Sequence, residues 1–133
     1  MAALNPKQDV ICSSDKLVDG GSGVRFTVMR AGQPCPAFAV RFAGRAYAYL
    51  NRCAHKLTEL DWEAGQFFDA EARYLVCATH GALYQPETGL CVAGPCRGAR
   101  LTALAVEEVQ GRVRLTGANG IHLAQRSADE VKS

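Results

Sequence analysis

Two short pairs of cysteine and histidine constrain this chain more than any other feature. The first pair is Cys53-Ala54-His55, and the second is Cys77-Ala78-Thr79-His80. Each pair offers one sulfur and one imidazole nitrogen from a tight turn, and 21 residues separate His55 from Cys77. Four such donors in two turns predict a metal site at which the two turns meet.

The order of the donors distinguishes between kinds of metal site. Structural zinc sites usually pair ligands of one kind, two cysteines followed by two histidines. Here each pair is mixed, which suits an iron–sulfur cluster in which one iron takes both thiolates and the other takes both imidazoles. Because histidine is a neutral ligand, such a cluster carries less negative charge than one held by four thiolates, and it accepts an electron more readily.

The residues that follow the second pair extend the pattern. His80-Gly81-Ala82-Leu83-Tyr84 is followed by Thr88-Gly89 and then by Gly94-Pro95. Together with the two pairs, these residues resemble the Rieske [2Fe–2S] family, and the resemblance covers roughly residues 24–116. It implies a Rieske [2Fe–2S] cluster as cofactor. The implied ligands are Cys53 and Cys77 on one iron and His55 and His80 on the outer iron.

The resemblance also implies weaker roles for residues around the cluster. Leu83 and Pro95, with Leu57, would shield the cluster from water, and Tyr84 stands where a tyrosine hydroxyl can donate to a ligand sulfur. The residues assigned to these surroundings are Lys56, Gly81, Leu83, Tyr84 and Pro95. Arg52, Arg97 and Arg100 border the same segments. We expect them to be ordinary solvated charges, with a docking surface for an acidic partner as the alternative.

Two departures from the family pattern bear on the reduction potential. High-potential members carry one extra cysteine in each ligand box, by which we mean a cysteine–histidine pair with the residues next to it. These two cysteines form a disulfide, and the corresponding residues here are Thr58 and Thr79. Those members also have a serine two residues after the second histidine, where this chain has Ala82. Hydrogen bonds to cluster sulfurs raise the potential. We therefore expect a potential near the bottom of the range of roughly −150 to +300 mV for Rieske centres.

Composition narrows the class of protein. A chain of 133 residues suits one domain with a real core, and a net charge of +2 is too small to argue for nucleic acid. Residues 1–20 have no apolar stretch that suits a signal peptide, and no window approaches the ~18 apolar residues of a transmembrane helix. The sequence therefore predicts a cytoplasmic protein.

Four cysteines remain besides the two predicted ligands: Cys12, Cys35, Cys91 and Cys96. We expect them to be free thiols, and a Cys91–Cys96 disulfide is left open as the alternative.

Short alternating segments and many glycines predict an all-β fold. The family resemblance implies a small antiparallel β-sandwich with an inserted cluster-binding subdomain at about residues 51–95 and a tail at 117–133. We expect a turn at 32–36 and a helical turn within 58–64. The expected strands are 24–30, 37–42, 45–50, 74–77, 82–84, 101–107 and 113–115, with a turn at Gln110-Gly111.

The leading functional hypothesis is a stand-alone ferredoxin, not itself an enzyme. It would take one electron from a flavin or iron–sulfur reductase and pass it to a terminal oxygenase. The alternative is a bound electron-transfer subunit of a larger reductase, related to the small subunit of nitrite reductase. A structural zinc domain explains the four donors but not the glycines that follow them. An oxygenase needs two more histidines for its mononuclear iron, and only His122 remains.

Overall fold

The computed structural model describes residues 10–52, 60, 65–77, 81–94, 97–116 and 121–124. Within this part of the chain the regular structure is almost entirely β, with a single short 3₁₀ helix, η1, at Ser14–Lys16. The strands are β1 Val10–Ser13, β2 Val24–Arg30, β3 Gln33–Phe42, β4 Arg45–Leu50, β5 Leu75–Val76, β6 Leu83–Tyr84, β7 Cys91–Ala93, β8 Ala103–Leu104, β9 Val106–Val109, β10 Arg112–Leu115 and β11 His122–Leu123.

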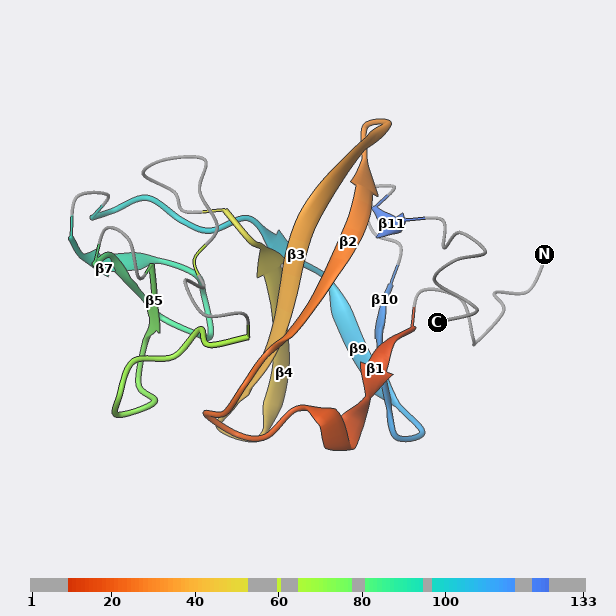
Figure 1. The fold of residues 1–133 in the computed structure, drawn as a ribbon, viewed down its shortest axis with the longest axis horizontal. Coiled ribbons are helices and arrows are strands. Elements are labelled where there is room, and N and C mark those ends of the chain that lie inside the picture. Colours follow the sequence, from red (N-terminus) through yellow and green to blue (C-terminus); the bar gives the residue numbers. More distant parts are fainter. Residues whose placement is uncertain are drawn as a thin grey trace.

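The strands form three antiparallel sheets. The large sheet has the order β11-β2-β3-β4-β8, the outer sheet has the order β1-β10-β9, and the small sheet has the order β5-β6-β7. In Figure 1 the long strands β2, β3 and β4 cross the middle of the molecule, with the small sheet on one side and the outer sheet on the other. This confirms the predicted all-β antiparallel sandwich.

The middle of β3 and the end of β4 are buried on both faces of the large sheet, because their side chains alternate between two cores. Small side chains of these strands, such as Ala37, Ala39 and Ala48, point toward the outer sheet, and the large rings of Phe38 and Tyr49 point the other way. We call the first group the sandwich core; it consists of Leu17, Val28, Cys35, Ala37, Ala39, Ala48, Leu50, Leu104, Val113 and Leu115. We call the second the lobe core; it consists of Phe38, Val40, Tyr49, Leu60, Phe67, Leu75, Cys77, Ala82, Tyr84, Cys91 and Leu101.

Several predicted boundaries are wrong, and each error has a local reason. The predicted turn at 32–36 is limited to Ala31 and Gly32, and β3 already begins at Gln33. Pro34 and Pro36 are tolerated there because this part of β3 pairs only with β2, while its ladder with β4 begins at Ala37. A proline at a strand edge removes no ladder hydrogen bond.

The C-terminal half also differs from prediction. The single strand predicted at 101–107 is divided at Ala105, because β8 pairs with β4 whereas β9 pairs with β10. The turn at Gln110-Gly111 is confirmed. β1 and β11 were not predicted; they are short strands that pair with their neighbours β10 and β2. The helical turn expected within 58–64 and most of the tail lie outside the described residues.

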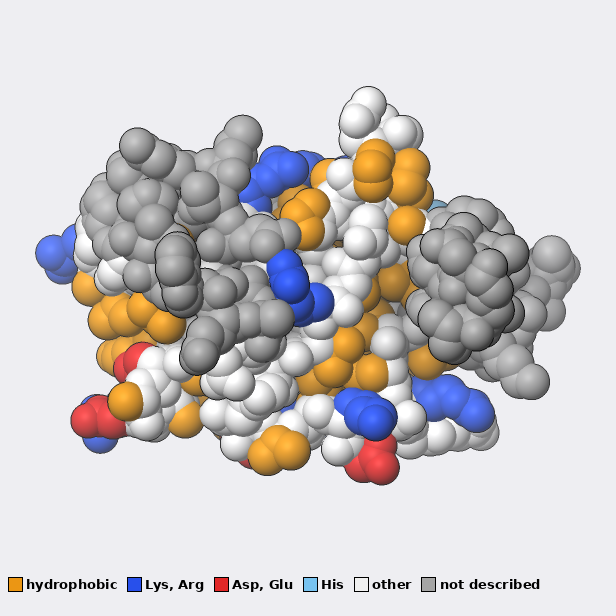
Figure 2. Space-filling model, viewed as in Figure 1, with side chains coloured by type: hydrophobic (Ala, Val, Ile, Leu, Met, Phe, Trp, Pro, Cys, Tyr) orange, Lys and Arg blue, Asp and Glu red, His pale blue; other side chains and the backbone are white. Residues whose placement is uncertain are grey.

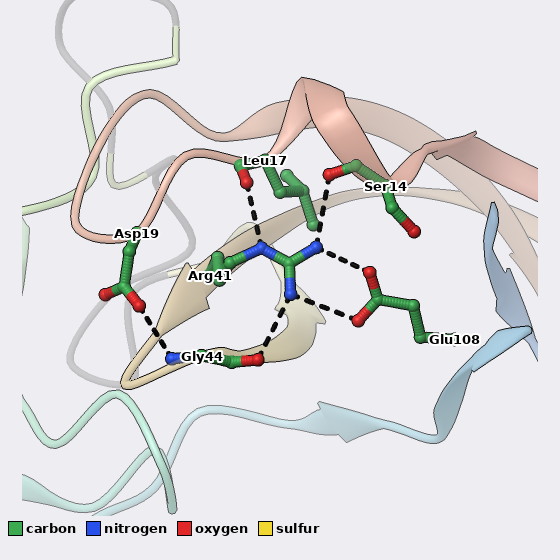
Figure 3. A network of polar contacts seen from close by, with 6 residues as sticks. All are labelled: Ser14, Leu17, Asp19, Arg41, Gly44 and Glu108. Atoms are coloured by element: carbon green, nitrogen blue, oxygen red, sulfur yellow. Dashed lines mark hydrogen bonds and ion pairs between the residues drawn. The ribbon is translucent and has the colours of Figure 1, made fainter. Parts of the chain in front are cut away.

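A partly buried arginine, Arg41, joins the N-terminal segment to the β3–β4 turn and to β9 of the outer sheet (Figure 3). The Arg41 guanidinium donates from Nε to the Leu17 carbonyl at 2.8 Å and from Nη2 to the Ser14 carbonyl at 3.1 Å. It also binds both carboxylate oxygens of Glu108 on β9, at 3.1 and 2.6 Å. A third carbonyl, that of Gly44 in the β3–β4 turn, accepts from Nη1 at 3.2 Å. One side chain therefore fixes three segments that are far apart in sequence.

We expect Arg41→Lys to lower the free energy of unfolding by about 1–3 kcal/mol. A lysine ammonium lacks the planar fork that reaches several acceptors at once, so buried carbonyls lose their donors. Urea denaturation of the full chain measures the change. Arg112→Lys, at an exposed position of β10, is the matched control and should alter stability by less than about 0.5 kcal/mol. Equal effects of the two substitutions would contradict this account.

The same ion pair predicts a pH dependence. The hydrogen bonds from Arg41 lower the pKa of Glu108 from its ordinary value of 4.5. A carboxyl whose pKa is lower in the folded state contributes stability above its ordinary pKa and loses that contribution as pH falls through the folded value. The stability difference between the wild type and Glu108→Gln should therefore be largest above pH 4.5 and shrink on further acidification. The exposed Glu71→Gln serves as control, and a difference that does not depend on pH would refute the assignment.

Candidate metal centre

The second predicted box begins where β5 ends. Cys77 directly follows β5, and its side chain is fully buried in the lobe core. Its N–H donates to the Ala82 carbonyl at 2.9 Å, and its carbonyl accepts from the Gly81 N–H at 2.7 Å. Gly81 has a φ of +74°, a conformation that glycine adopts at no steric cost. The glycine after the second histidine is therefore required by the turn that presents the box.

The distal Gly94 of the predicted motif lies against this same turn. A Cβ atom at Gly94 would come within 2.8 Å of the Ala82 Cα, closer than real Cβ atoms approach, and the φ of Gly94 is +101°. β7 reaches this position by pairing with β6, with Leu83 opposite Ala93 and Tyr84 opposite Cys91. Ala82 and Gly94, 12 positions apart in sequence, are thus brought together by backbone packing.

The first predicted box begins immediately after β4. Asn51 follows the strand, is buried, and donates its N–H to the Pro36 carbonyl at 2.8 Å. The Arg52 N–H donates to the Leu50 carbonyl at 2.9 Å, so the chain turns sharply there. Beyond the first pair, the Leu60 N–H donates to Asn51 Oδ1 at 2.8 Å. The strand predicted at 45–50 has the bounds of β4, and it ends three positions before Cys53.

One core holds the described residues that flank both pairs. Leu60, five residues after His55, and Cys77, at the start of the second pair, are both fully buried members of the lobe core. The donor chemistry and this arrangement fit a cluster held between two turns, with a buried thiol on the protein side. Five predicted site residues lie outside the described residues: Cys53, His55, Lys56, His80 and Pro95.

Two residues predicted to surround the cluster lie on β6. Tyr84 is fully buried between Leu75 and Cys91 of the neighbouring strands, and Leu83 is half-buried. The donation from the Tyr84 hydroxyl to a ligand sulfur, and the shielding by Leu83, stay predictions. Cys12 and Cys35 are free thiols. Cys91 is buried with its Sγ 3.2 Å from the Ala93 carbonyl, and Cys96 lies outside the described residues.

Tyr49 explains why the predicted motif has Thr88-Gly89 at this point. The sequence analysis did not identify Tyr49 as part of the site. The buried Tyr49 hydroxyl donates to the Pro86 carbonyl at 2.6 Å, and a Cβ at Gly89 would come within 2.8 Å of the Tyr49 ring. Burial raises the pKa of Tyr49, so the phenol keeps its proton as a donor. Thr88 Oγ1 accepts from the Leu90 N–H at 3.1 Å. The turn before β7 is therefore anchored on β4.

The long spacer between the boxes packs on the N-terminal segment. The Gly23 N–H donates to the Gly65 carbonyl at 2.8 Å, and Gln66 Nε2 donates to Ser22 Oγ at 3.1 Å. A Cβ at Gly23 would come within 2.7 Å of Phe67, whose ring stacks on Phe38 with centroids 4.0 Å apart. The spacer's described part, residues 65–76, thus has a defined place against the large sheet.

Three arginines border the predicted ligand segments in the described part of the chain. Arg97 and Arg100 are exposed on the segment after β7, and Arg52 is half-buried at the start of the first box. In Figure 2 the acidic side chains gather along the lower edge of this face, whereas Lys and Arg side chains occur along the upper edge as well. No helix of the described residues is long and apolar enough to cross a membrane.

Comparison with known proteins gives a family match and several structural matches. The Rieske [2Fe–2S] domain family matches residues 7–113. The ferredoxin of carbazole 1,9a-dioxygenase from Nocardioides aromaticivorans IC177 is 25% identical, with a TM-score of 0.63 over 80% of this chain and 93% of that chain. The Sphingomonas yanoikuyae B1 ferredoxin is 19% identical, with a TM-score of 0.62 over 82% and 97% of the two chains. No curated protein sequence matches.

The fold also occurs inside larger chains. The terminal oxygenase of carbazole 1,9a-dioxygenase from Nocardioides aromaticivorans IC177 is 20% identical and has a TM-score of 0.65. The match covers 89% of this chain but only 30% of the oxygenase chain. Because the family match extends over most of the sequence, the protein belongs to the Rieske [2Fe–2S] domain family, whose cofactor is a [2Fe–2S] cluster with cysteine and histidine ligands.

Proposed function

We propose that Cys53 and Cys77 bind one iron of the cluster and that His55 and His80 bind the other. The order of the four donors in the sequence supports this assignment. The described geometry adds that the Cys77 side chain is removed from water and that its turn is held by two backbone hydrogen bonds. Zinc could use the same donors, but family membership favours the [2Fe–2S] cluster.

We further propose that the protein is a one-electron carrier between a reductase and a terminal oxygenase, and that it catalyses no reaction of its own. The cluster, when bound, supplies a centre that takes up and releases one electron. The observation that carries the proposal is the match to ferredoxins of dioxygenase systems over nearly their whole length. One of these ferredoxins, 22% identical, is from a complex with the oxygenase of carbazole 1,9a-dioxygenase. The bound subunit of a larger reductase remains the second candidate, and the cytoplasmic location stays a prediction.

The cysteine and histidine ligands have different roles in such a carrier. Burial of Cys77 in the lobe core keeps water from the sulfur side of the centre. The two imidazoles are neutral ligands, so the reduced centre carries less negative charge than one with four thiolates. An imidazole nitrogen that faces solvent can also hold or lose a proton as the charge of the centre changes. We therefore assign the exit path of the electron to the histidine side.

Electron paramagnetic resonance of the dithionite-reduced protein tests the ligand set. With iron and sulfide intact, we expect a rhombic signal whose average g lies well below that of an all-cysteine cluster. The second part of the test is reduction by a reductase and reoxidation by a terminal oxygenase in solution. A colourless protein that contains zinc would overturn the cluster assignment. A normal signal without electron transfer to any oxygenase would favour the reductase subunit.

We expect Ala82→Ser to raise the reduction potential. Position 82 is the one at which high-potential family members place a serine that donates to a cluster sulfide, and such a bond stabilises the added electron. A tenfold change in the equilibrium constant of a one-electron couple corresponds to a shift of about 59 mV in its reduction potential. The free energy of a hydrogen bond to a charged group is large enough to cause a change of that size or more. The expected rise is thus on the order of 50 mV in a redox titration.

Ala39→Ser is the matched control, because Ala39 is equally buried but lies in the sandwich core. It should lower stability, since it buries a hydroxyl, and leave the potential unchanged. An Ala82→Ser protein with a full complement of cluster and an unchanged potential would show that position 82 does not face the cluster.

A further inference from the structure

Apart from tyrosine and cysteine, Asn51 is the one polar residue that is buried among the described residues. Its exposed fraction is 1%, and it stands directly after β4. A buried polar group that lacked a partner would destabilise the fold by about 1–3 kcal/mol. A buried asparagine at a strand end therefore indicates that its amide has a specific task.

That task is visible in the hydrogen bonds on either side of the residue. The backbone N–H of Asn51 binds the Pro36 carbonyl on β3, and its side-chain Oδ1 accepts from the Leu60 N–H, each at 2.8 Å. Leu60 is itself immobilised, because its side chain is fully buried in the lobe core. Asn51 thus ties residue 60 to the end of the large sheet, although eight residues lie between the two in sequence.

We propose that Asn51 is the positioning residue of the first ligand pair. By accepting from the Leu60 N–H, it sets the separation between residues 51 and 60, and Cys53 and His55 lie between these two positions in the sequence. The proposal rests on the ligand set proposed above. A short segment with fixed ends samples fewer conformations than one with a free end, so less ordering is needed when metal is bound. Ligand geometry in turn influences the electronic properties of a metal centre.

The chemistry of the position favours asparagine over its relatives. Alanine would leave the buried Leu60 N–H without an acceptor. Aspartate would keep an oxygen at the same distance, although a carboxylate in this core pays a larger desolvation cost. Asparagine supplies the acceptor without a charge. The side-chain amide therefore replaces the ladder hydrogen bonds that cease where β4 ends.

The test compares three variants of the full chain, each loaded with iron and sulfide. Asn51→Ala removes the acceptor, Asn51→Asp restores an oxygen at that position, and Val113→Ala weakens the distant sandwich core without touching the lobe core. The readouts are the g values of the reduced protein, the iron content per chain, and the rate at which the visible absorption bleaches in the presence of a chelator.

For Asn51→Ala we expect shifted g values and bleaching about tenfold faster than in the wild type, from the loss of one buried hydrogen bond. Asn51→Asp should return the g values and the iron content toward those of the wild type. Val113→Ala should lower the melting temperature with wild-type g values. If Asn51→Ala binds no iron, recovery of iron binding in Asn51→Asp supports the proposal, and a failure to recover overturns it.

Two further results would overturn the role of Asn51. One is an Asn51→Ala protein with the g values and bleaching rate of the wild type. The other is a Val113→Ala protein in which both quantities change as they do in Asn51→Ala, since the effect would then follow global stability. Failure of the ligand assignment is a separate result, because the wild-type protein itself would then lack the signal of mixed cysteine and histidine ligation.

Discussion

The rest of the structure depends on the hydrogen bonds of the Arg41 guanidinium. They hold the segment from Ser14 to Leu17 across the end of the β3–β4 hairpin, while the paired carboxylate of Glu108 adds the outer sheet. The Asp19 carboxylate continues the same attachment by accepting from the Ala43 and Gly44 N–H groups at 3.0 and 2.6 Å. Further along the same N-terminal segment, Gly23 packs on Gly65 and Phe67, so residues close to this attachment also support the spacer between the two ligand boxes.

β3 and β4 transmit this support to the candidate centre. Their small residues pack against the outer sheet, and their large rings extend into the lobe core. β4 is used twice more: Tyr49 binds the turn at Pro86, and Asn51 fixes Leu60. The turn at Pro86 and the residue Leu60 are therefore both attached to β4 or to the residue that follows it. Sites attached to strands hold their geometry better than sites supported only by other loops.

The sequence could predict the family and the central hairpin because both depend on local patterns. Alternation gave β2 with the observed bounds, and the ligand spacing gave the family. Strands that depend on distant partners could not be predicted: β1 and β11 are short, and the proline-containing start of β3 is a strand only because β2 lies beside it. The partner of the Asn51 amide was equally hidden, since Leu60 is nine positions away and no periodicity connects them.

The glycines of the motif are explained by the packing of the backbone and not by metal chemistry. Gly81 is needed for a turn with positive φ, Gly89 for the approach of the Tyr49 ring, and Gly94 for the approach of the Ala82 backbone. None of these requirements depends on which metal is bound, so the glycines by themselves do not distinguish one metal from another. What the glycines do specify is the distance between the second box and the turn at Gly94. A structural zinc site needs only its four ligands in a tetrahedron, whereas a cluster with two irons must also fit between two turns of fixed separation.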